Sequence, residues 1–110
     1  MLSIEYEYII VLITTPNQET SEMIANTLLE KKLAACVNLV GSIFSFYTWE
    51  GDINRDEEML LIVKSRVELF ESELIPVVQA VHPYDVPEII ALPIVKGSAN
   101  YLAWIDDVTH

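Results

Sequence analysis

The chain has 110 residues, of which six are Lys or Arg and 17 are Asp or Glu, so its net charge is −11 at pH 7. This acidic balance argues against nucleic acid as a partner, because phosphate binding needs a cluster of cations. No apolar run reaches the roughly 18 residues of a membrane span, so we expect no membrane partner.

Length and composition predict a single domain over residues 1–110. The lone cysteine, Cys36, excludes an internal disulfide. The first residues lack the basic region and the cleavage site of a signal peptide. We therefore expect a cytoplasmic protein.

The first predicted elements are a strand and a helix. Ile4–Thr14 is rich in Ile, Val and Tyr, which is typical of a strand. Thr15 is the predicted N-cap of the following helix, with Pro16 in its first turn. Lys31 and Lys32 mark its end, where cations suit the helix dipole.

Two long segments predict a hairpin. Ala34–Trp49 and Ile53–Lys64 have strand composition, and Glu50-Gly51-Asp52 between them is a turn signal. The 14 residues from Cys36 to Trp49 would span about 45 Å at ~3.3 Å per residue. A domain of this size is roughly 35 Å across. The hairpin should therefore overhang its own core.

The predicted tip of this hairpin is aromatic, with Phe44, Phe46, Tyr47 and Trp49 within six residues. Such side chains on a bare ribbon would form an exposed patch prone to aggregation. The simplest way to bury them is against another copy of the chain in a closed oligomer. The alternative is that Gly41 bends the ribbon back over its own sheet.

The second half predicts a helix, a strand and a last helix. Ser65-Arg66-Val67-Glu68 has the pattern of a capping box. Pro76 lies inside the helical pattern that follows, which predicts a kink or a break. Glu88–Lys96 is strand-like, and Pro93 favours an edge position or a bulge. The last helix begins after Gly97-Ser98.

The predicted order is therefore β-α-β-β-α-β-α. Its first six elements match a ferredoxin-like α+β plan, with two helices on one face of an antiparallel sheet. The C-terminal helix is an addition to that plan.

His82 is the first candidate for chemistry. It stands in His82-Pro83-Tyr84-Asp85-Val86-Pro87, where the prolines stiffen both ends of the turn. A preset imidazole is suited to bind a metal or carry a proton. The alternative is a histidine that caps the end of the preceding helix.

Cys36 is the second candidate, because thiolates bind soft metals such as Cu(I). The alternative is a small core residue, since its neighbours are apolar. One Cys and one or two His do not make a closed structural zinc site, which needs four ligands. Carboxylates or a neighbouring subunit would have to complete a site.

The simplest reading of the carboxylates Asp56, Glu57 and Glu58 is a solvated face. In a strand, however, alternate residues share a face, which puts Glu58 on the same face as the apolar Leu60. Glu58 would then turn toward an interface or pair with Arg55 or Lys64. Glu88 could face the same junction as His82.

The sequence contains neither a nucleophile elbow nor a phosphate-binding glycine loop, so we do not expect an enzyme.

Taken together, these segments resemble the CutA family of divalent-cation tolerance proteins over nearly the whole chain. The resemblance is carried by Leu33-Ala34-Ala35-Cys36-Val37-Asn38, Tyr47-x-Trp49-x-Gly51-x-Ile53, Lys64, His82-Pro83-Tyr84-Asp85-Val86-Pro87-Glu88 and Tyr101-Leu102-x-Trp104-Ile105.

The resemblance implies a PII-like homotrimer that binds divalent cations, chiefly copper, with no organic cofactor. It implies a trimer interface that includes Phe44, Phe46 and Trp49. Some relatives have a further cysteine where this chain has Ile13, which cannot bind a metal. Residues expected around an inter-subunit cleft are Cys36, Tyr47, Trp49, Lys64, His82, Tyr84 and Glu88.

Two hypotheses follow. In the first, a cytoplasmic trimer binds copper through His82, with Cys36 as a second ligand. In the second, a PII-like signalling or scaffold trimer binds a small molecule or a partner protein in the inter-subunit cleft.

Overall fold

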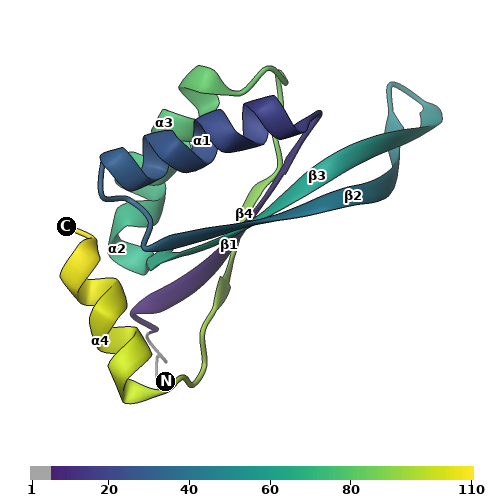
Figure 1. Cartoon of the computed structure of the whole chain (residues 1–110). Coiled ribbons are helices and arrows are strands. Elements are labelled where there is room, and N and C mark those ends of the chain that lie inside the picture. Colours follow the sequence, from purple (N-terminus) through teal and green to yellow (C-terminus); the bar gives the residue numbers. More distant parts are fainter. Residues whose placement is uncertain (1–5) are drawn as a thin grey trace.

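The computed structural model describes residues 6–110, so Ile4 and Glu5 of the predicted first strand lie outside the described residues. It confirms the predicted order and splits the second helix into three segments (Figure 1). The elements are β1 (Tyr8–Thr15), α1 (Gln18–Glu30), β2 (Cys36–Trp49), β3 (Asp52–Arg66), α2 (Val67–Leu69), the π-helical η1 (Phe70–Leu74), α3 (Ile75–Val81), β4 (Ile89–Pro93) and α4 (Ala99–Val108).

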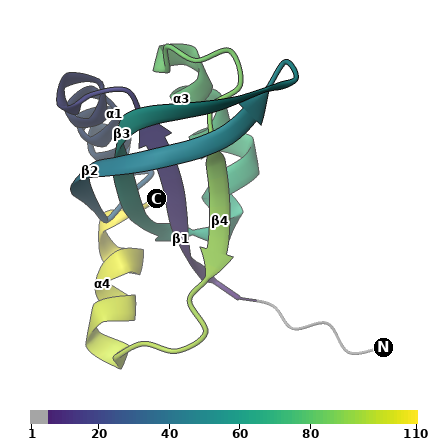
Figure 2. The same ribbon diagram turned by 90° about the vertical axis from the view of Figure 1, so that its right-hand side faces the viewer.

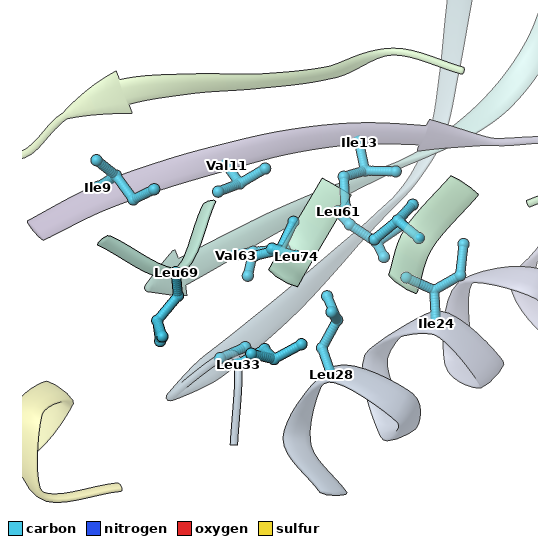
Figure 3. Packing of buried hydrophobic residues seen from close by; sticks show 12 residues of the cluster. Ile9, Val11, Ile13, Ile24, Leu28, Leu33, Leu61, Val63, Leu69 and Leu74 are labelled. Atoms are coloured by element: carbon cyan, nitrogen blue, oxygen red, sulfur yellow. The ribbon is translucent and has the colours of Figure 1, made fainter. Parts of the chain in front are cut away.

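The four strands form one antiparallel sheet in the order β2-β3-β1-β4, as the ferredoxin-like plan requires. Helices α1 and α3 cover one face of this sheet (Figure 1). Alternate residues of β1 and β3 point into the core beneath these helices, as the period of a strand demands (Figure 3). The fully buried members of this core include Val11, Ile13, Ile24, Leu28, Leu61, Val63, Leu74 and Val78.

The opposite face of the sheet is apolar and largely open. Helix α4 lies at one end of it (Figure 2). There Tyr8 donates a hydrogen bond to Asp106, and Arg66 Nε donates to Thr109 Oγ1 at 2.8 Å. Farther along, Ile90 and Leu92 are 50% and 49% exposed. This surface is unusual for a protein that stays monomeric, because large contiguous apolar patches mark interaction sites.

Two predicted helix caps are wrong. The N-cap of α1 is Asn17, whose Oδ1 accepts from the Thr20 amide at 2.8 Å. Thr15 stays in β1, where it pairs with Met59. Ser65 is likewise a strand residue, and its hydroxyl donates to the Leu33 carbonyl at 2.6 Å. In both cases sheet pairing extends one or two residues beyond the strand end that the pattern predicted.

The predicted interruption at Pro76 is confirmed. The π-helical segment η1 directly precedes α3, and Pro76 lies in the first turn of α3. The helical backbone continues through this point, because the Ile75 amide donates to the Phe70 carbonyl five residues back, so the irregularity beside Pro76 is a π-helical turn and not a gap. Pro93 also lies where predicted, since it ends β4 on an edge of the sheet.

The hairpin of β2 and β3 extends beyond the helices, as predicted (Figure 1). Its turn uses positive φ angles at Glu50 (52°) and Gly51 (84°), the left-handed region that suits glycine. The strand register shifts between Val40 and Ile43 around Gly41, but the ribbon does not fold back over its sheet. The aromatic residues of its tip therefore stay exposed.

Within residues 6–110, no helix is long and apolar enough to cross a membrane.

Candidate functional site

A cleft opens between the outer part of the hairpin, the end of β1 and the loop after α3. Its volume is about 570 Å³. The loop brings the predicted residues Tyr84 and Glu88 to it, and the hairpin brings Tyr47 and Trp49. The cleft is lined by Thr14, Ser45, Phe46, Tyr47, Trp49, Asp56, Glu58, Tyr84, Asp85, Val86 and Glu88.

His82 lies behind the cleft and orients the loop that lines it. It ends α3 with an extended backbone (φ −79°, ψ 136°), as expected of a residue before proline. Its ring is buried, with Nε2 2.8 Å from the Thr14 carbonyl oxygen. A carbonyl only accepts, so Nε2 is the protonated nitrogen. Nδ1 then accepts from the Tyr84 amide at 3.1 Å.

Both nitrogens of His82 are thus engaged inside the subunit, in a neutral ring with one defined tautomer. The ring does not cap α3, as the alternative supposed; only its backbone amide does, by donating to the Val78 carbonyl at 2.9 Å. A metal would have to displace the Tyr84 amide to reach Nδ1. The ring lies 4.7 Å from that of Tyr84, centroid to centroid.

Tyr84 and Glu58 join the loop to the hairpin. The Tyr84 hydroxyl donates to Glu58 Oε2 at 2.7 Å, and Glu58 is only 7% exposed. Burial, together with this hydrogen bond to a carboxylate, raises the pKa of Tyr84 above its ordinary value. The expected partners of Glu58 were wrong: Arg55 lies 4.4 Å over the Phe44 ring, and Lys64 donates to Asn38.

Glu88 adds a second carboxylate to the cleft. Partial removal from water and the negative charge of Glu58 raise its pKa above the ordinary carboxylate range. A raised carboxylate pKa means that the surroundings disfavour negative charge. Positive charge placed in the cleft would relieve this repulsion.

The hairpin supplies the aromatic side of the cleft. Tyr47 donates a hydrogen bond to Asp56, and this contact raises the pKa of its hydroxyl. Phe46 and Trp49 are 68% and 50% exposed. The predicted interface residues are thus accessible in the single subunit.

Cys36 and Lys64 are not brought to the cleft. They pair with each other across β2 and β3. Thr14, which holds His82, pairs with Leu60, four residues from Lys64 along β3. That offset is about 13 Å at ~3.3 Å per residue. Cys36 therefore cannot share a metal with His82 of the same subunit in this conformation.

Among residues 6–110, no group of three or more His, Cys, Asp or Glu side chains is arranged to hold a metal ion. The sequence flagged Glu58 as oddly placed but did not reveal Tyr84 as its partner. Thr14 and Val86 were not predicted in the cleft at all. These residues line the cleft because β1, the hairpin and the loop after α3 come together there, which the sequence pattern does not indicate.

The fold and the cleft define a small ferredoxin-like α+β protein with an acidic, aromatic site beside the outer part of a long hairpin. The match to known proteins is consistent across sequence and structure. This chain belongs to the CutA1 divalent ion tolerance protein family, whose model matches residues 9–108. The description of the family and the name of its Thermus thermophilus member refer to tolerance of divalent cations and to no enzymatic activity, in agreement with the prediction.

Individual relatives match over most of this chain. The divalent-cation tolerance protein CutA of Thermus thermophilus is 47% identical over 100 residues, covering 91% of this chain and 96% of the relative. The chloroplastic CutA of Arabidopsis thaliana is 50% identical over 102 residues, covering 93% of this chain. This chain spans only 56% of that longer relative.

Solved structures agree with the fold. A Thermus thermophilus divalent cation tolerance protein superimposes with a TM-score of 0.91 at 46% identity, covering 94% of this chain and 99% of the other. The Oryza sativa CutA1 structure also superimposes with a TM-score of 0.91 at 46% identity, covering 96% of this chain and 95% of the other. An Archaeoglobus fulgidus relative described as periplasmic superimposes with a TM-score of 0.90 at 46% identity, covering 94% of this chain and 99% of the other.

Proposed function

We propose that residues 1–110 act as one domain of a cytoplasmic homotrimer that binds divalent cations, copper above all, and serves in divalent cation tolerance. The observation that carries this proposal is the contact of buried Glu58 with Tyr84, next to Glu88 with its raised pKa. The cleft concentrates negative charge, which a divalent cation would neutralise.

The open face of the sheet and the overhanging hairpin support the proposed trimer. Exposed Phe44, Phe46 and Trp49 on the hairpin and exposed Ile90 and Leu92 on the sheet need a partner surface. A second and a third copy would supply it in a closed arrangement. The cleft would then lie close to a neighbouring subunit.

Ligands from more than one subunit would complete the metal site. Glu58 and Glu88 offer oxygen atoms, and divalent copper has the highest affinity of the common divalent ions for mixed N, O and S ligands. His82 and Cys36 remain the proposed nitrogen and sulfur ligands. Because they lie apart within one subunit, a site that used both would draw them from two subunits.

Calorimetric titration of Cu(II) and Zn(II), with a weak competing chelator at physiological salt, tests the proposal. We expect copper-selective binding with a whole-number stoichiometry that Glu58→Gln weakens at least about tenfold. Glu22→Gln, on the exposed side of α1, is the matched control for lost charge. Weak binding that salt abolishes equally in all variants would overturn the proposal.

The second candidate function is a PII-like signalling or scaffold role, in which the cleft binds a small molecule or a partner protein. The volume of the cleft favours it, because about 570 Å³ is the size of a small-molecule pocket.

A further inference from the structure

A second pocket lies on the helical side of the molecule, where the chain after α4 reaches the region of α2 (Figure 1). Its volume is about 440 Å³. Its walls come from the end of α1, from η1 and α3, and from the chain after α4. They consist of Lys31, Leu33, Ser72, Glu73, Pro76, Val77 and His110. None of these residues belongs to the hairpin or to the open face of the sheet, so the surfaces proposed to pack in the trimer do not include this pocket.

His110 is held at this pocket by its backbone. Its amide donates to the Lys32 carbonyl at 3.2 Å, and its carbonyl accepts a hydrogen bond from the Arg66 guanidinium. The preceding residue, Thr109, is buried, and its hydroxyl accepts from Arg66 Nε at 2.8 Å. The chain after α4 is therefore tied both to β3 and to the end of α1, and a held backbone presents the imidazole in a defined place.

Glu73 faces this imidazole from η1. His110 Nε2 lies 3.4 Å from Glu73 Oε1, and the two side chains are 52% and 43% exposed. The segment that carries Glu73 is π-helical, and π-helical turns are frequent at functional sites. An ion pair accounts for the distance when the imidazole is protonated. The same distance also fits a second arrangement, in which both atoms bind one metal ion.

The geometry of metal coordination sets the distance between two ligand atoms. Two atoms at about 2.1 Å from a tetrahedral ion are about 3.4 Å apart. A neutral imidazole nitrogen is the commonest protein ligand of late transition metals, and a carboxylate oxygen complements it. The pocket of about 440 Å³ has room for bound waters of about 30 Å³ each to complete the coordination.

The two histidines of the chain differ in how available their nitrogens are. Both ring nitrogens of His82 are engaged, one with the Thr14 carbonyl and one with the Tyr84 amide. The His110 ring is half-exposed, and its Nε2 faces a carboxylate that can bind the same ion. A metal ion can therefore reach Nε2 of His110 without displacing a backbone hydrogen bond.

One group in the pocket opposes cation binding. Lys31 lines the pocket, and its ammonium group repels a metal ion. Because Lys31 is exposed, water and salt reduce this repulsion without removing it. Two protein ligands beside a like charge make a weak site, and loss of the Lys31 charge should strengthen it.

We propose that Glu73 and His110 form a second divalent-metal site, in which one subunit supplies both protein ligands to an ion such as Zn(II) and water completes the coordination. The ion takes the place of the ion pair and fastens the chain after α4 to the helical layer. This inference goes beyond the proposed function, because the site needs no neighbouring subunit and uses neither Glu58 nor Glu88.

The test is a titration of the whole protein with zinc chloride at slightly alkaline pH and physiological salt, followed by nuclear magnetic resonance. The chain has two histidines, His82 and His110, whose ring C–H signals can be observed separately. The signals of His110 should shift saturably. Magnesium chloride at the same concentration is the control, because Mg²⁺ prefers oxygen ligands and should leave the His110 signals in place.

Four variants identify the ligands. Glu73→Gln should weaken Zn(II) binding at His110 at least about fivefold, because it removes a ligand. Glu71→Gln removes the same charge from the same segment and should weaken binding less than about twofold. Lys31→Gln should strengthen binding by about twofold, because it removes a like charge. Glu58→Gln, in the cleft, should leave binding at His110 as in the parent.

The outcomes are distinct. Equal affinity of the parent and Glu73→Gln would reveal a lone surface imidazole and overturn the two-ligand site. Unshifted His110 signals, or shifts confined to His82, would overturn it as well. Saturable shifts at His110 that depend on Glu73 and persist in Glu58→Gln support the inference whether or not the cleft binds copper. Failure of the cleft to bind copper would count against the divalent-cation proposal alone.

Discussion

The phenol of Tyr84 lies 2.7 Å from Oε2 of Glu58 and donates a hydrogen bond to it. This contact links the loop after α3 to strand β3 across 26 residues of sequence. It holds one wall of the cleft against the other. Glu58 is only 7% exposed, and the Tyr84 hydroxyl supplies its carboxylate with a hydrogen-bond donor.

Removing the Tyr84 hydroxyl should destabilise the fold. Tyr84→Phe leaves Glu58 Oε2 without its donor, and a hydrogen bond to a charged group contributes about 1.5–3 kcal/mol. We expect the free energy of unfolding to fall by about 1–2 kcal/mol because the site is only partly buried. Urea unfolding of Tyr84→Phe, Glu58→Gln and the double variant measures the coupling. Strictly additive effects would contradict the importance of the contact.

His82 should act as a buried structural support as well as a candidate ligand. His82→Ala removes the bonds to the Thr14 carbonyl and the Tyr84 amide. We expect a loss of about 2–3 kcal/mol in the free energy of unfolding. His110→Ala, an exposed histidine, is the control and should change little. Equal stability of the two variants would show that the His82 bonds contribute nothing net.

The same His82→Ala protein addresses copper ligation. If His82 gives up its Tyr84 bond to bind Cu(II), the visible absorption of the copper complex should change in the variant. An unchanged copper spectrum would remove His82 from the metal site. It would leave the carboxylates of the cleft as the proposed ligands.

Glu88 should make stability depend on pH. Its pKa is raised in the folded state by loss of water and by Glu58, so folding favours the protonated form. The stability it contributes is complete below the ordinary carboxylate pKa and is lost as the pH rises through the raised value. Thermal unfolding from acidic to neutral pH should show that loss in the parent and a smaller one in Glu88→Gln. If the parent and Glu88→Gln lost the same stability over this pH range, Glu88 would not be the group responsible.

The open face of the sheet should mediate assembly. Leu92→Asp puts a charge on an exposed strand position, and such a charge cannot be buried without a partner. Light scattering should show a parent of three subunits and a variant of lower mass. Leu29→Asp, on α1 with 42% exposure, is the control on the helical face. A Leu92→Asp protein of unchanged mass would exclude this part of the face from the interface.

Local patterns were sufficient for the order of the elements. Strand composition, the turn at Gly51 and the prolines at 76 and 93 are signals that act over a few residues. The predicted helix caps failed because of contacts that are distant along the chain. Thr15 and Ser65 have the right side chains to cap a helix, but their backbones are already paired in the sheet. Pairing with a distant strand overrides a local preference.

The sequence by itself determined the ferredoxin-like plan, the overhanging hairpin and the family resemblance, because each depends on composition and spacing along the chain. Only the tertiary structure decided which side chains meet. It put Tyr84 against Glu58, engaged both nitrogens of His82, and separated His82 from Cys36 by several strand positions. Such contacts depend on strand register and on where three segments cross, and neither is encoded in any short stretch of the chain.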